Sequence, residues 1–388
     1  MNVFSPESID VVAIRRDLHA HPELAFAEHR TTEVIVDRLR ASGLSPKVLP
    51  SGTGVVCDLG SDGPMIALRA DIDALPIADL KDVPYRSTVE DLCHGCGHDA
   101  HTAILLGVAH ELARQPIDGR VRLIFQPAEE TVPGGAFAAV GDGVLDGVEQ
   151  IYALHCDPRV ATGHVGVRVG AITAACDHIE VTLAGSGGHT ARPHLTQDLV
   201  FAAGQLITDL PGLLSRRVDP RAALSMVWGS VQAGRAANAV PMSGRLRGTL
   251  RVFDRDAWDS AGPLVSALVD QIVAPSGVRA HTEYTKGVPP VINAVEAVAV
   301  QRQAVVHALG QDALVDTAQS MGGEDFAWYL EEIPGALARL GVRKAGAPAF
   351  DLHQGTFDID EDALMLGVRY SVALAHSALA DARADAEE

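Results

Sequence analysis

Residues 65–70 read MIALRA, residues 100–113 read AHTAILLGVAHELA, and residues 121–125 read VRLIF. The first and third stretches are short apolar runs with the length of a buried strand, and the stretch between them is helical in pattern. Two further apolar runs, at residues 55–59 and 151–154, lie on either side. This alternation of strand and helix predicts an α/β fold, a mostly parallel sheet with helices on both faces.

A different pattern begins near Cys176 and ends near Gly287. Strands are expected at residues 177–183, 224–228, 244–252 and 280–285, and helices at residues 196–214 and 256–274. The order strand, helix, strand, strand, helix, strand predicts an inserted α+β domain. A chain of 388 residues is also long for a single core. We therefore expect a catalytic domain of residues 1–175 and 288–388, and an inserted lid or dimerisation domain at residues 176–287.

Charge and composition exclude several classes of partner. The net charge is −19, which disfavours binding to nucleic acid or to an anionic membrane. We find no run that approaches the roughly 20 apolar residues needed to span a bilayer. Residues 1–10 lack the basic and apolar regions of a signal peptide, and five cysteines do not form an evident disulfide framework. We expect a cytoplasmic protein with free thiols.

The densest group of metal-binding residue types is HGCGHDAH, at residues 94–101. Thiolate, imidazole and carboxylate ligands from Cys96, His98 and Asp99 would suit zinc or a similar divalent ion. The glycines on both sides of Cys96 allow the backbone to bend so that Cys96 and His98 face one ion. The alternative is a polar turn before a helix, with Asp99 as the N-cap.

Other polar residues follow the predicted strands. Asp71, Glu129 and His155 each lie just after a strand, at the edge where α/β proteins bind ligands. Glu129 and Glu130 are adjacent carboxylates, which can divide metal binding and proton transfer between them or can be two solvated side chains. His155 and His353 each fit either a metal ligand or a structural histidine.

A glycine-rich stretch, GSGGHTARPH, lies at residues 185–194 in the expected insert. It could cradle an anion or bring His189 towards a reacting carbonyl, or it could be a flexible loop. It is not a Walker phosphate loop, because no Gly-Lys-Ser/Thr follows.

These motifs occur in one order along nearly the whole chain, and that order resembles a known family. The motifs are DLHAHPEL (residues 17–24), ALRADIDALPI (67–77), HGCGHDAHT, IFQPAEE, ALHCDP, GSGGHTARPH, MGGEDFAWYL (321–330) and LHQGTFDIDEDAL (352–364). The family is that of dinuclear metallopeptidases and amidohydrolases, which includes aminoacylase, carboxypeptidase G, hippurate hydrolase and the auxin-conjugate hydrolases. The CGHD motif, paired with RAD, resembles the hippurate hydrolase and auxin-conjugate branch.

The resemblance implies two divalent metal ions per subunit: zinc, manganese, cobalt or nickel. Their ligands would be Cys96, His98, Glu130, His155 and His353. Glu129 would be the general base, and Asp71 and Asp99 would support catalysis by orienting ligands. From the insert, His189 would stabilise the oxyanion, usually across a homodimer in this family. Asn238, Arg251 and Glu324 would lie near the substrate, with Asp325 beside them.

The function implied is that of a metal-dependent amidohydrolase that cleaves the amide bond of a small N-acyl amino acid. A dipeptidase or aminopeptidase on the same scaffold is an alternative, and it would need an acidic partner for the substrate amine. A catalytically inactive metal- or ligand-binding protein is another. The presence of Glu129 beside Glu130 argues against it, because a binding protein needs no general base.

Overall fold

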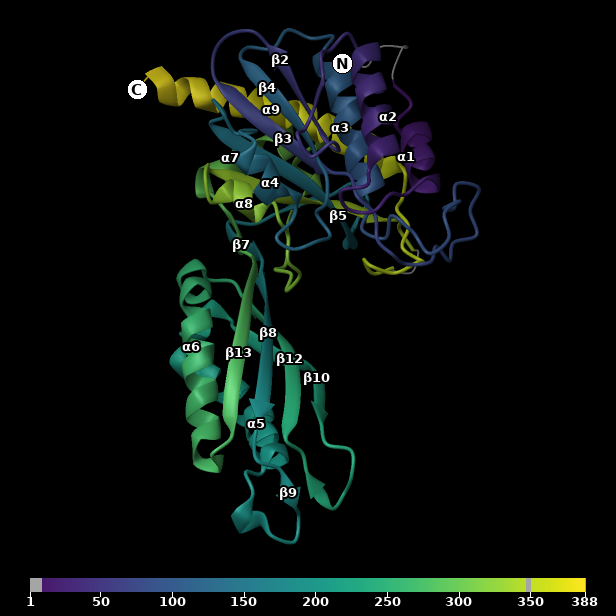
Figure 1. Ribbon diagram of the computed structural model, residues 1–388. Helices are drawn as coiled ribbons and strands as arrows, with labels where there is room; N and C mark the ends of the chain where they lie inside the picture. Colours follow the sequence, from purple (N-terminus) through teal and green to yellow (C-terminus); the bar gives the residue numbers. More distant parts are fainter. Residues whose placement is uncertain (1–8, 347–349, 388) are drawn as a thin grey trace. The chain divides into compact units, whose positions relative to one another are not determined.

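The computed structural model describes residues 9–346 and 350–387, and the chain divides into two compact units (Figure 1). The first unit consists of Met1–Gly170, Ile292–Ala318 and Asp325–Glu388, and the second of Ala171–Val291 and Gln319–Glu324. The second unit begins and ends within five residues of the expected insert, but it also includes the short segment Gln319–Glu324. An isolated bridge between Thr173 and Ser320 joins this segment to it.

The first unit contains a mixed sheet whose centre is parallel. Among the described residues, its strands lie in the order β1-β2-β4-β3-β5-β16-β6-β15. Their bounds are Lys47–Val48, Val55–Gly60, Arg120–Gln126, Met65–Asp71, Gln150–Ala161, Gly335–Arg343, Val165–Val167 and Leu314–Asp316 in that order. The neighbours β4-β3-β5-β16 are parallel, whereas β2 pairs with β4 and β6 pairs with β16 in antiparallel fashion. The predicted mostly parallel α/β sheet is confirmed.

The helices of the first unit pack on this sheet and on one another. They are α1 (Val11–Ala20), α2 (His29–Ala41), α3 (His98–Leu112), α4 (Gly135–Gly141), α7 (Val295–Leu309), α8 (Ala327–Leu330) and α9 (Asp362–Glu387). α9 contacts both α3 and α7. At the contact with α3, a Cβ on Gly107 would lie 2.6 Å from Val368, so glycine permits the close approach of the two helices.

One helix departs from the expectation that no segment could cross a membrane. The stretch Asp362–Ala384 of α9 is long and apolar enough by length and composition. However, 61% of its apolar window is buried inside the protein. Because its side chains form part of the core with α3 and the sheet, α9 has the character of a core helix.

The described residues of the second unit include a four-stranded antiparallel sheet and two α-helices. The strand order is β10-β12-β8-β13, with bounds Ser225–Ala233, Ser243–Val252, Ala175–Ala184 and Arg279–Val288. The helices are α5 (Leu199–Arg217) and α6 (Arg255–Val273). Burial alternates along β8 and β12, as expected for a sheet covered on one face. The chain order of these elements is the order that the alternating pattern predicted.

Candidate metal centre and active site

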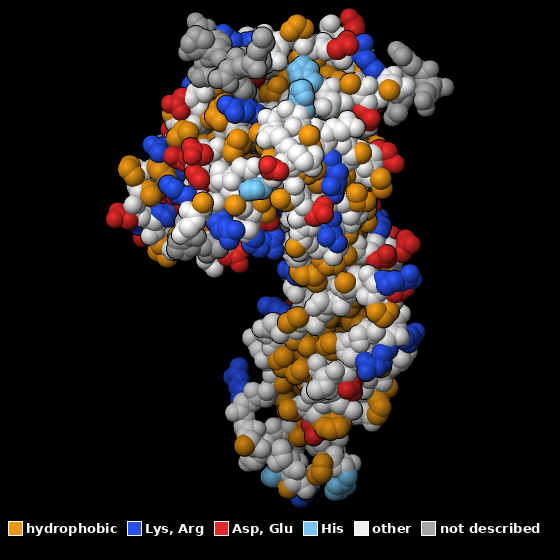
Figure 2. Space-filling view, turned by 180° about the vertical axis from the view of Figure 1, so that it is seen from behind, with side chains coloured by type: hydrophobic (Ala, Val, Ile, Leu, Met, Phe, Trp, Pro, Cys, Tyr) orange, Lys and Arg blue, Asp and Glu red, His pale blue; other side chains and the backbone are white. Residues whose placement is uncertain are grey.

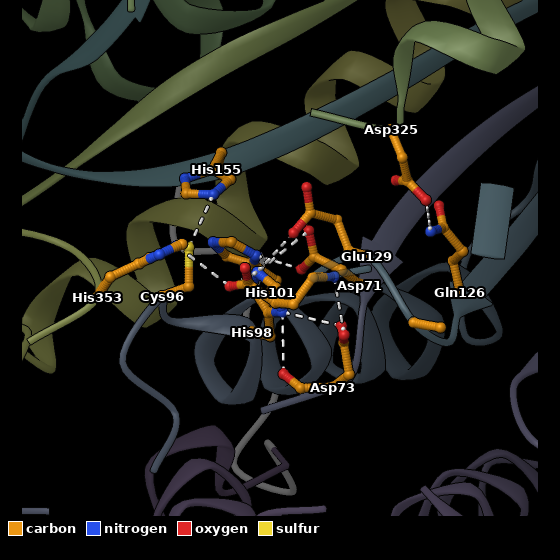
Figure 3. Close-up of polar contacts among 12 residues, drawn as sticks. Asp71, Asp73, Cys96, His98, His101, Gln126, Glu129, His155, Asp325 and His353 are labelled. Carbon is orange, nitrogen blue, oxygen red and sulfur yellow. Dashed lines mark hydrogen bonds and ion pairs between the residues drawn. The ribbon is translucent and has the colours of Figure 1, made fainter. Parts of the chain in front are cut away.

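The predicted metal ligands converge from the start of α3 and from the turn after β4 (Figure 3). Cys96 and His98 flank Gly97, the N-cap of α3, which has a φ of 92°. That left-handed backbone favours glycine and turns the chain so that both neighbours contribute to the cluster. Ligand atoms of Cys96, His98 and His155 lie within 4.8 Å of one another, as do those of Cys96, Glu130 and His353. The structure therefore brings all five predicted ligands together.

The two remaining histidines come from later parts of the chain. His155 lies inside β5, because this strand continues to pair with β16 beyond the apolar run at residues 151–154. Its Nε2 atom is 3.5 Å from Cys96 Sγ. The Nε2 atom of His353 is 3.3 Å from Glu130 Oε1. Glu129 lies beside this cluster, with its Oε2 atom 3.9 Å from His98 Nε2.

The polar atoms of the cluster fit bound cations. One buried atom, His98 Nε2, has no hydrogen-bond partner among the described residues. Buried polar atoms in folded proteins are nearly always paired, and a divalent cation would satisfy this atom. One thiol, three imidazoles and one carboxylate form a donor set that suits zinc, manganese, cobalt or nickel.

The electrostatics of the cluster also favour positive charge. Burial, together with the Glu130 carboxylate, raises the pKa of the Cys96 thiol well above its ordinary value. A thiolate at this position therefore requires a nearby cation. Burial lowers the pKa of His98, but Asp71 and Cys96 outweigh burial and raise that pKa well above its usual range. The carboxylates and the thiol around His98 thus favour positive charge at this site.

Asp73 orients two ligands at once. The His98 Nδ1 atom donates to the Asp73 carbonyl oxygen at 2.9 Å and lies 3.2 Å from carboxylate Oδ1. The other carboxylate oxygen accepts from the Glu130 backbone N–H at 2.9 Å. With Nδ1 engaged, Nε2 is the His98 atom available to a metal.

Asp71 acts on the cluster largely through His101. Its buried carboxylate accepts from Arg69 at 2.6 Å and from His101 Nδ1 at 2.5 Å, and it lies 3.7 Å from His98 Nε2. The His101 Nε2 atom accepts from the Cys156 backbone N–H at 2.8 Å. The Cys156 carbonyl in turn accepts from Nδ1 of the neighbouring His155 at 2.8 Å. This chain of hydrogen bonds fixes the His155 ring, so the geometry of Asp71 is that of a positioning residue.

Asp99 faces α1 and holds that helix to α3. Its Oδ2 atom accepts from Arg15 Nε at 2.8 Å and from His19 Nδ1 at 2.6 Å. The alternative reading of Asp99 as the N-cap is wrong, because α3 begins at His98 with Gly97 as its cap. The helix begins two residues earlier than the pattern suggested, because glycine can adopt the positive φ required at its cap.

Four of the predicted site residues belong to the second unit: His189, Asn238, Arg251 and Glu324. His189 is exposed on a short ribbon in which β9 (Gly188–His189) pairs with β11 (Ala239–Val240). Asn238 lies directly before β11, so it neighbours His189 on this ribbon. Arg251 donates to the carbonyl oxygen of Met321, and Glu324 is buried. Their contacts with substrate stay predictions.

The adjacent Asp325 belongs to the first unit and forms hydrogen bonds with side chains of β3 and β4. It accepts from the Gln126 side chain at 2.7 Å (Figure 3). It also accepts from Arg69 at 2.7 Å and from the Ala136 backbone N–H. Asp73 and His101 were not singled out from the sequence, although both lie inside quoted motifs. Motif position was the only available signal for them, because their partners are distant in the chain.

Comparisons with known proteins agree with this geometry. The family model described as peptidase family M20/M25/M40 matches residues 67–377. The chain is 38% identical over 359 residues to the N-acetyl-L-cysteine deacetylase of Bacillus subtilis. This match covers 92% of this chain and 85% of that protein. A B. subtilis structure described as a dinuclear metal-binding peptidase from the M20 family covers 95% of this chain and 98% of its own, with a TM-score of 0.84 and 34% identity.

A relative of higher identity is much longer than this chain. It is a Rhodococcus jostii protein named putative glutamate–cysteine ligase 2-3, 51% identical over 365 residues. The match covers 94% of this chain but only 46% of that relative. The chain therefore spans about half the length of this protein.

Proposed function

This chain belongs to peptidase family M20/M25/M40, and on that premise we propose that it is a metal-dependent amidohydrolase acting on N-acyl amino acids. The observation that carries the proposal is the five-ligand cluster with an additional carboxylate, Glu129, beside it. A protein that only stored or sensed metal would have no need of that second carboxylate.

We assign the two divalent ions to Cys96, His98, Glu130, His155 and His353. When bound, such ions lower the pKa of a water molecule and polarise a carbonyl oxygen. Glu129 is the group placed to take the proton of the attacking water and to return it to the leaving amine. Asp73 and His101 hold His98 and His155 in the tautomers whose Nε2 atoms face the metals.

The second unit would supply the groups that meet the substrate. We assign oxyanion stabilisation to His189, and contacts with the polar groups of the substrate to Asn238, Arg251 and Glu324. In the described residues, β10 is an edge strand that carries the exposed Val227 and Val231. Hydrophobic side chains are visible on the surface of this unit (Figure 2). We propose that two such units pair in a homodimer, which would cover these groups.

Mixing two inactive variants tests the shared site. If His189 acts on the partner's metal centre, heterodimers of His189→Ala and Glu129→Gln protein contain one site with both groups intact, and activity returns. No recovery after demonstrated subunit exchange would contradict a site shared between subunits.

For the substrate, we propose an N-acylcysteine or a closely related N-acyl amino acid. The B. subtilis relative is named for deacetylation of N-acetyl-L-cysteine. The Rhodococcus relative is named for a ligase that joins glutamate to cysteine, and free cysteine is the amino acid that deacetylation of N-acetylcysteine would release. Both names thus involve cysteine, which deacetylation would release and the ligase would consume.

A substrate panel tests the function. The metal-reconstituted protein would be assayed for amine release from N-acetylcysteine, from other N-acetyl and N-benzoyl amino acids, and from dipeptides with a free amine. We expect hydrolysis of the N-acyl compounds in wild-type protein and its loss in Glu129→Gln. Faster hydrolysis of free-amine dipeptides would indicate a dipeptidase instead. No hydrolysis of any amide by protein with two bound metals would refute the proposal.

A further inference from the structure

The turn that carries Glu129 and Glu130 has a backbone conformation that needs outside support. Ala128, the residue before them, is buried and has a φ of 58°. Residues with a Cβ atom rarely adopt this left-handed conformation, and they keep it only where surrounding contacts enforce it. The orientation of both carboxylates therefore depends on what holds this turn.

Two carboxylates hold the turn, one on each side of Glu129. Glu28 Oε1 accepts from the Ala128 backbone N–H at 2.8 Å, although the two residues are 100 positions apart. Asp73 Oδ2 accepts from the Glu130 backbone N–H at 2.9 Å. Glu28 is fully buried, so its carboxylate is shielded from water and has a defined place.

The side chain of Glu28 reaches the turn, whereas Glu23 caps the helix that Glu28 begins. Glu28 is the N-cap residue of α2, but its side chain makes no capping hydrogen bond. The two oxygens of Glu23 instead accept from the backbone N–H groups of Arg30 and Thr31, at 3.0 and 2.7 Å. These are donors that a helix start leaves unpaired. Glu23 and Glu28, five residues apart, therefore have different tasks.

We propose that Glu28 is a positioning residue, whose hydrogen bond to Ala128 holds Glu129 and Glu130 in the orientation that binds metal and transfers protons. The inference rests on the proposed function, since it concerns the same two carboxylates. Without this acceptor the Ala128 N–H is buried and unpaired, and the turn relaxes away from its left-handed conformation. Displacements of about 1 Å at such groups are enough to weaken binding and catalysis.

The test compares two substitutions of similar size in the full-length protein. Glu28→Met removes the acceptor and Glu28→Gln keeps one, the amide oxygen. The readouts are Co²⁺ affinity against a competing chelator, the visible spectrum of bound Co²⁺, and kcat and KM. Glu28→Met should lower the affinity of at least one Co²⁺ by about 10- to 100-fold, as loss of outer partners of metal ligands does. It should also change the Co²⁺ spectrum and lower kcat more than it raises KM. Glu28→Gln should keep the Co²⁺ affinity, the Co²⁺ spectrum and the kinetic constants close to those of wild-type protein.

Glu23→Ala is the matched control, because it removes two hydrogen bonds at the start of the same helix without touching the turn. It should destabilise the protein and leave Co²⁺ affinity unchanged. If Glu28→Met does not fold, Glu28→Asp takes its place, since it retains the charge but shortens the reach.

The outcomes separate the inference from the function on which it rests. Wild-type Co²⁺ affinity and spectrum in a folded Glu28→Met or Glu28→Asp variant would overturn the role of Glu28. So would an equal loss in Glu23→Ala, because the effect would then be general destabilisation. Absence of Co²⁺ binding by wild-type protein would instead overturn the proposed function, and this inference with it.

Discussion

Replacing Asp99 with asparagine should destabilise the protein through a buried ion network. The Asp99 carboxylate accepts from Arg15 at 2.8 Å and from His19 at 2.6 Å. All three side chains are at most 1% exposed, so water cannot replace the lost charge. The substitution keeps the size of the side chain and removes its charge.

We expect a loss of about 3 kcal/mol in the free energy of unfolding. Removing one partner of a buried ion pair costs about 3–5 kcal/mol. Arg15 keeps a second carboxylate, that of Asp358 at 2.8 Å, and the asparagine oxygen can still accept one hydrogen bond. These remaining interactions place the expected value at the lower end of the range.

The pH dependence of unfolding should change as well, through His19. Burial lowers the pKa of His19, but the carboxylates of Asp99 and Asp79 outweigh burial and raise it to about 10. An unfolded histidine titrates near about 6.5. Protonated His19 therefore stabilises the folded state fully below about pH 6.5, and this contribution is lost as the pH rises towards about 10. Removing the Asp99 charge should make that decline shallower.

Urea unfolding followed by circular dichroism at pH 6.5 and pH 9.5 measures both effects. Asp316→Asn is a suitable control, because Asp316 pairs with Arg302 at the surface and is 82% exposed. It should remain within about 0.5 kcal/mol of wild type. A loss below about 1 kcal/mol in Asp99→Asn, or an unchanged difference between the two pH values, would refute the reasoning.

Glu129→Gln should retain metal and fold but lower kcat by about 10²- to 10⁴-fold, and turnover close to wild type would contradict its role as the base. Metal removal by a chelator should abolish hydrolysis and lower the thermal unfolding midpoint, because cations that bind the native state stabilise it. Full activity of protein shown to be metal-free would exclude metal-dependent catalysis. Gly135→Ala should lower both stability and metal affinity, since its Cβ would lie 1.9 Å from the Pro127 carbonyl oxygen, and an unchanged melting curve would disprove that clash. His101→Ala should weaken metal binding by about 10- to 100-fold, and His101→Gln, which keeps a donor and an acceptor, should weaken it less. Equal affinities in these two variants would argue against the hydrogen-bond chain to His155.

Local patterns in the sequence were sufficient for the fold class. Apolar runs such as residues 65–70 and 121–125 became β3 and β4, because a strand buried on both faces is apolar throughout. The alternating stretches of the insert became β8 and β12, because a sheet covered on one face alternates with a period of two. Strand ends were less predictable. β5 extends to Ala161, because its length depends on pairing with β16, and no local pattern encodes that pairing.

The five candidate ligands could also be named from the sequence, because the order of the motifs that contain them resembles that of a known family, which implies this ligand set. The structure decided which partner each supporting side chain faces. Asp71 and Asp99 were both expected to orient ligands. Asp71 binds His101, from which hydrogen bonds lead to the ligand His155, whereas Asp99 binds Arg15 and His19 of α1. The contact from Glu28 to Ala128 joins residues 100 positions apart. Hydrophobic periodicity shows which face of an element is buried, but it does not show which distant backbone or side-chain group that face meets. Only the packing of α1 and α2 on α3, and of α3 on the parallel strands, brings these groups within hydrogen-bonding distance.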